Sequence, residues 1–95
     1  MEVEQVQLKN GTALGIKIEM MTAPLLLIKT GKGFVMCGYL NIEAAEKMGD
    51  TAAKVSGVKT FEDVLNAKVN ALTSKAKEIG VKEGMTGREA LEKMI

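Results

Sequence analysis

The stretch Leu8–Met20, LKNGTALGIKIEM, decides the fold of the first half of the chain. Large aliphatic residues occupy every second position from Leu14 to Met20, with small or charged residues between them. This alternation predicts a β-strand with the aliphatic face buried, because successive side chains of a strand point to opposite faces. Asn10-Gly11 precedes the strand and accepts the positive φ angles of a tight hairpin turn. The apolar segment Val3–Leu8 is therefore expected to pair with it.

Two more apolar segments follow Pro24. Leu25–Thr30 (LLLIKT) and Gly33–Leu40 (GFVMCGYL) are joined by Gly31-Lys32-Gly33, which we interpret as a turn between paired strands. Both segments are apolar at consecutive positions. Both of their faces are therefore expected to be covered, either by the chain's own helices or by another subunit.

From Asn41 onward, apolar residues recur at helical spacing. Asn41 is predicted to cap a short helix that ends at Gly49. Residues 51–58 are ambiguous between helix and strand, and the glycines around them favour a strand. Strands that precede helices in a single domain, residues 1–95, predict the α+β class, with antiparallel hairpins first.

Two capping patterns predict the remaining helices. Thr60 with Asp63 predicts a helix that continues to Gly80, with an interruption near residues 68–70. Thr86 with Glu89 forms a full capping box for a last helix. The buried side of this last helix is expected to carry Ala90, Leu91, Met94 and Ile95.

The composition is that of an ordinary globular protein, with 46% hydrophobic and 26% charged residues and a formal net charge of +1. The near-neutral charge and the three aromatic residues argue against nucleic-acid binding. The longest apolar run, Ala23–Ile28, is far shorter than the ~20 residues that span a bilayer. One cysteine forms no internal disulfide, and the start MEVEQVQ lacks the pattern of a secretory signal, so we expect a cytoplasmic protein.

The chain contains no histidine. Ser-His-Asp and Cys-His arrangements are therefore impossible within one chain. A zinc site is excluded as well, because one cysteine without histidine cannot supply the usual ligands. We expect no metal site and no cofactor.

Cys37 stands at the end of a predicted strand, followed by Gly38 and, four residues on, by the helix start at Asn41. Three interpretations stay open: a core residue, a ligand contact without covalent chemistry, and a nucleophile activated by a lysine or a helix N-terminus. Free cysteine is among the most buried residue types, which favours the first interpretation.

Two further segments carry candidate anion-binding groups. In Gly84–Glu89 (GMTGRE), glycines lead into a capped helix with Arg88 in its first turn, where free amides and a guanidinium favour an anion. The alternative there is a capped surface helix with Arg88 paired locally. Lys59 precedes the helix start at Thr60, an unfavourable place for a cation unless an anion compensates. A solvated lysine is the alternative.

Three segments carry a resemblance to a known family: Cys37–Leu40 (CGYL), Gly57–Leu65 (GVKTFEDVL) and Gly84–Leu91 (GMTGREAL). Together they resemble the YunC-like family, known as domain of unknown function 1805. The resemblance implies small cytoplasmic α+β proteins of archaea and bacteria, in which the N-terminal β region mediates assembly into tetramers. It implies no activity and transfers no site residue.

Our leading hypothesis is a cytoplasmic homo-oligomer that self-associates through its N-terminal strands and binds a small anionic ligand. Its ligand-binding residues are Cys37, Gly38, Asn41, Lys59, Thr86, Gly87 and Arg88. One alternative is a small enzyme that uses Cys37 or Lys59 in a site shared between subunits. Another is a structural or partner-binding subunit. None of the three is expected to bind nucleic acid or a membrane.

Overall fold

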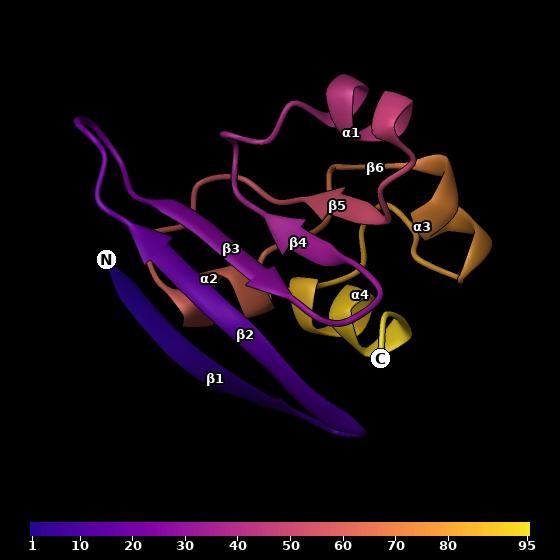
Figure 1. The fold of residues 1–95 in the computed structure, drawn as a ribbon, viewed down its shortest axis with the longest axis horizontal. Helices are drawn as coiled ribbons and strands as arrows, with labels where there is room; N and C mark the ends of the chain where they lie inside the picture. The colour runs from indigo at the N-terminus through magenta and orange to yellow at the C-terminus, as the bar shows by residue number, and fades with distance from the viewer.

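The computed structural model describes all 95 residues and contains a six-stranded sheet with four helices. The strands are β1 (Glu2–Leu8), β2 (Gly11–Ile18), β3 (Leu25–Lys29), β4 (Phe34–Met36), β5 (Ala52–Lys54) and β6 (Ala71–Leu72). The helices are α1 (Ile42–Met48), α2 (Phe61–Asn66), α3 (Ser74–Glu78) and α4 (Gly87–Lys93). The strands follow one another across the sheet in chain order, and all neighbours are antiparallel except the parallel pair β4–β5 (Figure 1). The predicted α+β class is confirmed.

Two short strands lie among the helices, so the predicted order of strands first and helices afterwards is incomplete. β5 falls in the ambiguous segment 51–58, where a strand was the favoured interpretation. The helix expected from Thr60 to Gly80 is interrupted, as expected near residues 68–70, but the interruption is wider and contains β6, so α2 and α3 are separate helices. Asn70 N–H donates to Lys54 O at 2.9 Å and Thr73 N–H to Ala52 O at 3.0 Å, so this backbone pairs with β5 instead of continuing a helix.

The first hairpin forms as predicted, but its turn differs. Leu8 pairs with Gly11, so the two-residue loop is Lys9-Asn10 and Gly11 begins β2. No residue of this turn has a positive φ. Gly11 has a packing role instead, because an added Cβ would lie 3.1 Å from Ile95 Cγ2 at the chain's end. The second predicted turn is present, with Lys29 paired to Phe34.

The predicted caps begin their helices. Asn41 Oδ1 accepts a hydrogen bond from Ala44 N–H at 3.1 Å, and α1 ends at Gly49 with φ of 79°. Thr86 and Glu89 form the complete capping box of α4. These bonds satisfy amides that a helix start leaves free.

One face of the sheet packs against α2 and α4, which lie behind the sheet in Figure 1. The core between these layers includes the fully buried side chains of Leu26, Ile28, Val35, Val55, Val64, Val69, Val81, Leu91 and Met94. Ala90, Leu91 and Met94 are buried as expected, and Ile95 is half-buried. None of the four helices has the length and hydrophobicity needed to cross a membrane.

The alternation in β2 is confirmed, but the face that the monomer buries is the other one. Ala13 and Gly15 point into the core, whereas Leu14 and Ile18 are 38% and 37% exposed. The reason is Phe61 of α2, whose ring lies so close to Gly15 that an added Cβ would be 2.8 Å from Phe61 Cε1. The position of Gly15 on β2, where α2 packs against the strand, therefore leaves no room for a larger side chain.

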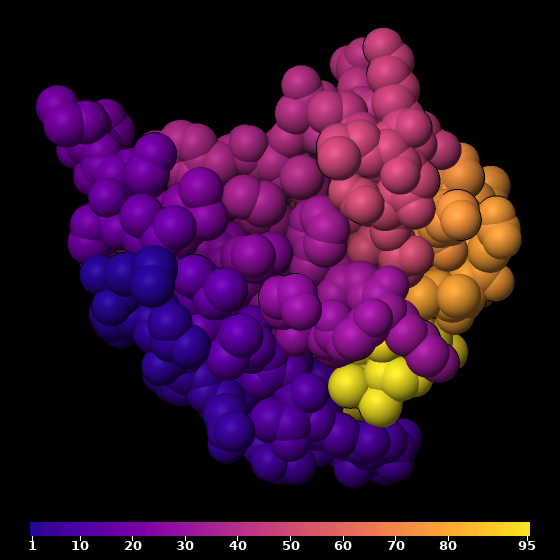
Figure 2. All heavy atoms as spheres, viewed as in Figure 1, coloured from indigo at the N-terminus to yellow at the C-terminus, as the bar shows by residue number.

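The large apolar residues of the first strands therefore share the opposite face, which we call the open face. Cross-strand pairing aligns Val3 with Ile16, Ile16 with Leu27 and Leu27 with Met36. The open face comprises Val3, Leu14, Ile16, Ile18, Leu25, Leu27 and Met36. No helix covers β1–β3 on this side, which Figure 2 shows as the indigo and violet surface.

Candidate functional site

A cavity of about 390 Å³ opens at the rim of the sheet, where β3 begins and β4 and β5 end. β3 is antiparallel to β4, and β5 is parallel to β4. The first residue of β3 and the last residues of β4 and β5 therefore lie at the same rim, where three loops meet. They are Ala23–Pro24, Cys37–Tyr39 and Gly57–Lys59. Three residues that the sequence singled out, Cys37, Gly38 and Lys59, are thus brought together.

Cys37 forms the inner wall of the cavity. It follows the last residue of β4, is 4% exposed, and belongs to the core cluster. Its N–H donates to Leu26 O at 3.0 Å, and its Sγ accepts from Leu26 N–H at 3.3 Å. Most of the thiol therefore packs against the protein, and only a small part borders the cavity.

Lys59 is the only charged residue in the cavity wall. It is exposed, and its ammonium forms no ion pair, since both ion pairs in the structure belong to Lys17. The Lys59 N–H donates to Asp63 Oδ2 at 3.0 Å, so this carboxylate in the first turn of α2 is held by the backbone next to the cavity. The lysine side chain remains available to a ligand.

Five residues that line the cavity have backbone amides that donate to no protein group. They are Ala23, Gly38, Tyr39, Gly57 and Val58. Gly57 has a left-handed φ of 72°, which lets the loop turn sharply between β5 and α2. Loop amides without an internal acceptor are groups that bind anions in many proteins.

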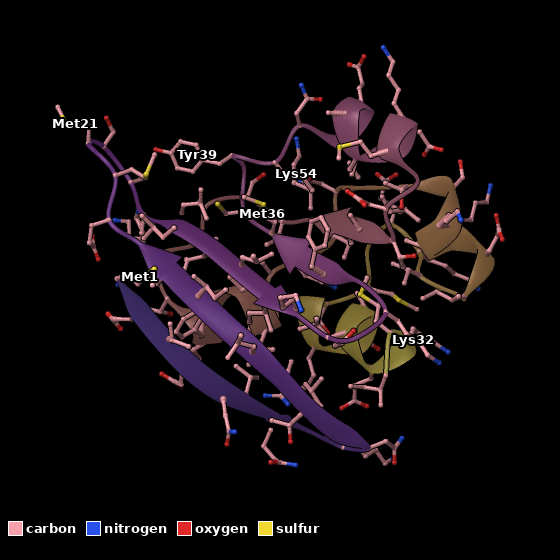
Figure 3. All side chains as sticks on the ribbon, viewed as in Figure 1. Met1, Met21, Lys32, Met36, Tyr39 and Lys54 are labelled. Atoms are coloured by element: carbon pink, nitrogen blue, oxygen red, sulfur yellow. The ribbon has the colours of Figure 1, made fainter.

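Tyr39 lines the cavity and is bonded to a second lining residue. Its hydroxyl donates to Ala23 O at 3.3 Å, and the side chain is 47% exposed. Figure 3 shows Tyr39 pointing from the loop after β4 toward the β2–β3 loop, whose tip carries Met21. The hydrogen bond links two of the three loops that line the cavity.

The other predicted site residues lie elsewhere. Asn41 caps α1, and Arg88 is exposed on α4; neither borders the cavity. Thr86 and Gly87 lie where α4 meets α2. The structure thus divides the predicted set into a cavity group, which contains Cys37, Gly38 and Lys59, and residues at two separate helix starts.

The start of α4 is already occupied by a carboxylate of the chain. Thr86 N–H donates to Glu89 Oε1 at 2.9 Å, and Glu89 N–H donates to Thr86 Oγ1 at 3.1 Å. Two hydrogen bonds lower the pKa of Glu89 from its ordinary value. The bond from the Thr86 backbone has the larger effect and the bond from the Thr86 hydroxyl the smaller one. Gly87 N–H donates to Ala67 O at 2.9 Å. An external anion would have to displace Glu89 here.

A second cavity, of about 350 Å³, lies between α1 and α3 and was missed in the sequence. Glu46 of α1 accepts from Ser74 N–H at 2.7 Å and from Ser74 Oγ at 2.8 Å, so it closes the start of α3. Both bonds lower the pKa of Glu46 from its ordinary value, the bond from the Ser74 backbone more than the bond from the Ser74 side chain. The wall of this second cavity contains Lys77 and Lys82 together with acidic side chains, so the cavity has no net preference for one sign of ligand charge.

No group of three or more Cys, Asp and Glu side chains is placed to hold a metal ion.

Ala23, Pro24, Tyr39, Gly57 and Val58 complete the first cavity and were not predicted as site residues. The signal that could have found them is their position in the chain. Each lies within four residues of the first residue of β3 or of the last residue of β4 or β5. This signal becomes usable only once β4 and β5 are known to be parallel neighbours.

Comparison with known proteins identifies the family. The domain of unknown function DUF1805 matches residues 36–94. The chain belongs to the DUF1805 family. The resemblance noted in the sequence is thereby confirmed. The match includes the cavity loops Cys37–Tyr39 and Gly57–Lys59, whereas β1–β3 precede it.

Two relatives of this DUF1805 chain extend the comparison. The uncharacterized protein YunC of Bacillus subtilis (strain 168) is 31% identical over 84 residues, which cover 84% of this chain and 83% of YunC. The crystal structure of TA1206, a protein of unknown function from Thermoplasma acidophilum, is 37% identical with a TM-score of 0.94. The similarity covers 99% of this chain and 92% of TA1206, so it includes the N-terminal strands.

Proposed function

We propose that this DUF1805 protein is a cytoplasmic homo-oligomer that binds a small anionic ligand in the cavity between Cys37–Tyr39 and Gly57–Lys59. The observation that carries the ligand proposal is the unpaired ammonium of Lys59 in a wall that contains no carboxylate. The five amides of lining residues without an internal acceptor add hydrogen-bond donors to the same wall. Such charge-assisted and backbone donors favour a negative ligand over a neutral or positive one.

A second candidate function is catalysis, because Cys37 and Lys59 border the same cavity. Binding is the better supported of the two. The Cys37 sulfur is almost entirely buried and accepts the Leu26 N–H, so it is packed as a core atom. An activated thiol needs a more accessible position.

Self-association is proposed through the open face of β1–β3. Its large side chains include Val3, which is 57% exposed, and the aligned row from Val3 through Ile16 and Leu27 to Met36. Burial of apolar surface contributes about 25 cal/mol per Å². A second copy on this face would therefore gain free energy that the monomer leaves unused, and the family resemblance implies four copies in all.

A thermal-shift screen tests the ligand. Phosphate, nucleotides and simple carboxylates are added to the parent protein, to Lys59→Gln and to the control Lys75→Gln, whose lysine lies on α3 outside both cavities. A ligand whose concentration is 100 times its Kd stabilises the folded state by about 2.7 kcal/mol. This raises the Tm by about 11–22 °C in a domain of this size. We expect the shift in the parent and the control and its loss in Lys59→Gln. A screen in which no anion raises the Tm removes the proposal.

Light scattering after size exclusion tests self-association. The parent should elute with a multiple of the 10.2 kDa chain mass, and Ile16→Glu should reduce it to a single chain. Asn66→Glu places the same charge at the exposed end of α2, on the helix-covered side, and should leave the mass unchanged. A parent protein of 10.2 kDa at every concentration contradicts assembly. A stable monomer that binds neither anions nor itself would favour the partner-binding alternative.

A further inference from the structure

We propose that the ligand of the Lys59 cavity is a monocarboxylate with an apolar body. This inference rests on the proposed anion-binding function and specifies the chemical class of its ligand. It is carried by the composition of the cavity wall, in which one cation is surrounded by apolar side chains. The carboxylate would lie at Lys59 and the body against the opposite wall.

The charge of the wall favours a single negative charge. Lys59 supplies one positive charge, and no other charged residue lines the cavity, since the Asp63 carboxylate that the Lys59 N–H holds lies outside the lining. A carboxylate balances this charge, whereas a phosphate group carries −1.5 to −2 charges at neutral pH and would leave an excess. The second cavity, with its lysines and glutamates, offers no such selectivity.

The remaining surface of the cavity suits hydrocarbon. Apart from Lys59 and two glycines, the wall consists of Ala23, Pro24, Cys37, Tyr39 and Val58. A bare inorganic anion would touch few of these side chains. A ligand that covers them removes its own apolar surface and theirs from water, which favours binding.

Tyr39 supplies the largest apolar side chain of the wall. Its hydroxyl donates to Ala23 O at 3.3 Å, which links the ring to another residue that lines the cavity. Tyrosine combines a large apolar face with little conformational entropy to lose, which makes it an effective binding surface. The volume of about 390 Å³ lies at the small end of the ~300–1,000 Å³ of ligand pockets, so the body is short.

Calorimetry with acetate, butyrate and hexanoate tests the inference. A fully buried methylene contributes about 0.8 kcal/mol, equivalent to roughly a fourfold tighter Kd. Allowing for methylenes that stay partly in water, we expect hexanoate to bind at least about tenfold more tightly than acetate. Inorganic phosphate should bind more weakly than hexanoate. Hexanol and hexylammonium, which have the same chain without the negative charge, should bind at least about tenfold more weakly than hexanoate.

Two variants separate the charge from the apolar wall. Lys59→Gln should weaken all three carboxylates by a similar factor and leave the gain per methylene unchanged. Tyr39→Ala should reduce the gain per methylene, whereas Tyr39→Phe, which keeps the ring, should retain most of it. Tyr39 is half exposed, so both substitutions are compatible with folding, and thermal unfolding checks this directly. Lys75→Gln should match the parent in every titration.

The outcomes distinguish the two proposals. If acetate or phosphate binds as tightly as hexanoate, the monocarboxylate inference is overturned and anion binding stands. The same inference is overturned if hexanol binds as tightly as hexanoate. If a nucleotide of the thermal-shift screen binds and the carboxylates do not, only the monocarboxylate inference is overturned. If no anion of either experiment binds, the proposed function itself fails, and the inference fails with it.

Discussion

Replacement of Gly87 by alanine tests the packing of α4 against α2. Alanine is normally preferred to glycine within a helix by about 0.5–1 kcal/mol. In this structure an added Cβ would overlap the carbonyl oxygen of Val64, and it would lie 3.0 Å from the Val64 carbonyl carbon. Both are backbone atoms, so no rotamer change can relieve the contact. The helices must move apart.

The cost of that movement can be estimated from its surroundings. Val64, Ala90 and Leu91 are fully buried between α2, α4 and the sheet, and Gly87 N–H donates to Ala67 O at 2.9 Å. Overpacking of a well-packed core costs about 1–3 kcal/mol, and a contact between backbones belongs at the upper end or above. After subtraction of the helix preference, we expect a net loss of about 2–3 kcal/mol. This corresponds to a fall in Tm of about 8–24 °C.

Thermal unfolding followed by circular dichroism measures the loss. Gly31→Ala is the matched control, because an added Cβ there meets no atom within 4 Å and Gly31 has no positive φ. The control should equal or slightly exceed the stability of the parent. A Gly87→Ala protein as stable as the parent would refute the close approach of α4 to Val64, and with it the assignment of Gly87 to packing.

Three further predictions follow from buried or bonded side chains. Hydrogen bonds to Ser74 and Thr86 lower the pKa of Glu46 and Glu89 below the ordinary glutamate value of about 4.3, so the stabilisation they give is present above that value and is lost as the pH falls through the folded pKa. The double variant Glu46→Gln/Glu89→Gln should therefore show a shallower loss of stability in acid unfolding, and an unchanged acid slope would contradict this. Thr30 is buried and its hydroxyl donates to Met94 O at 2.8 Å, so Thr30→Val should cost about 1–3 kcal/mol in urea unfolding; a neutral effect would show that the bond contributes nothing. Cys37 should react with a thiol reagent far more slowly in the native state than in urea, and equal rates would place its sulfur at the surface.

Helix starts were predictable because their causes are local. A capping side chain bonds to an amide three residues further on, so Asn41 and Thr86 identify their helices without reference to the rest of the chain. The segment from Thr60 to Gly80, predicted as a helix with an interruption near residues 68–70, was described incompletely for the opposite reason. Its middle pairs with β5, which lies in the chain before the helix begins.

The candidate site was predictable only in part. Cys37 and Lys59 were chosen for their chemistry, and they meet because β4 and β5 are parallel neighbours that end at the same rim. Gly87 was chosen for the free amides of a helix start, but its lack of a side chain serves the contact with Val64. Local sequence cannot distinguish a glycine that exposes its amide from one that admits another backbone.

Sequence patterns by themselves determined the α+β class, the first hairpin and the caps, because each depends on residues a few positions apart. Only the tertiary structure decided which face of β2 is buried. Period-two alternation makes two faces but does not say which one meets a helix, and here the ring of Phe61 fits over Gly15 alone. The aliphatic residues were consequently left on the open face, and the loops of three distant segments were brought together around Lys59. Contacts between residues far apart in the chain determine both outcomes.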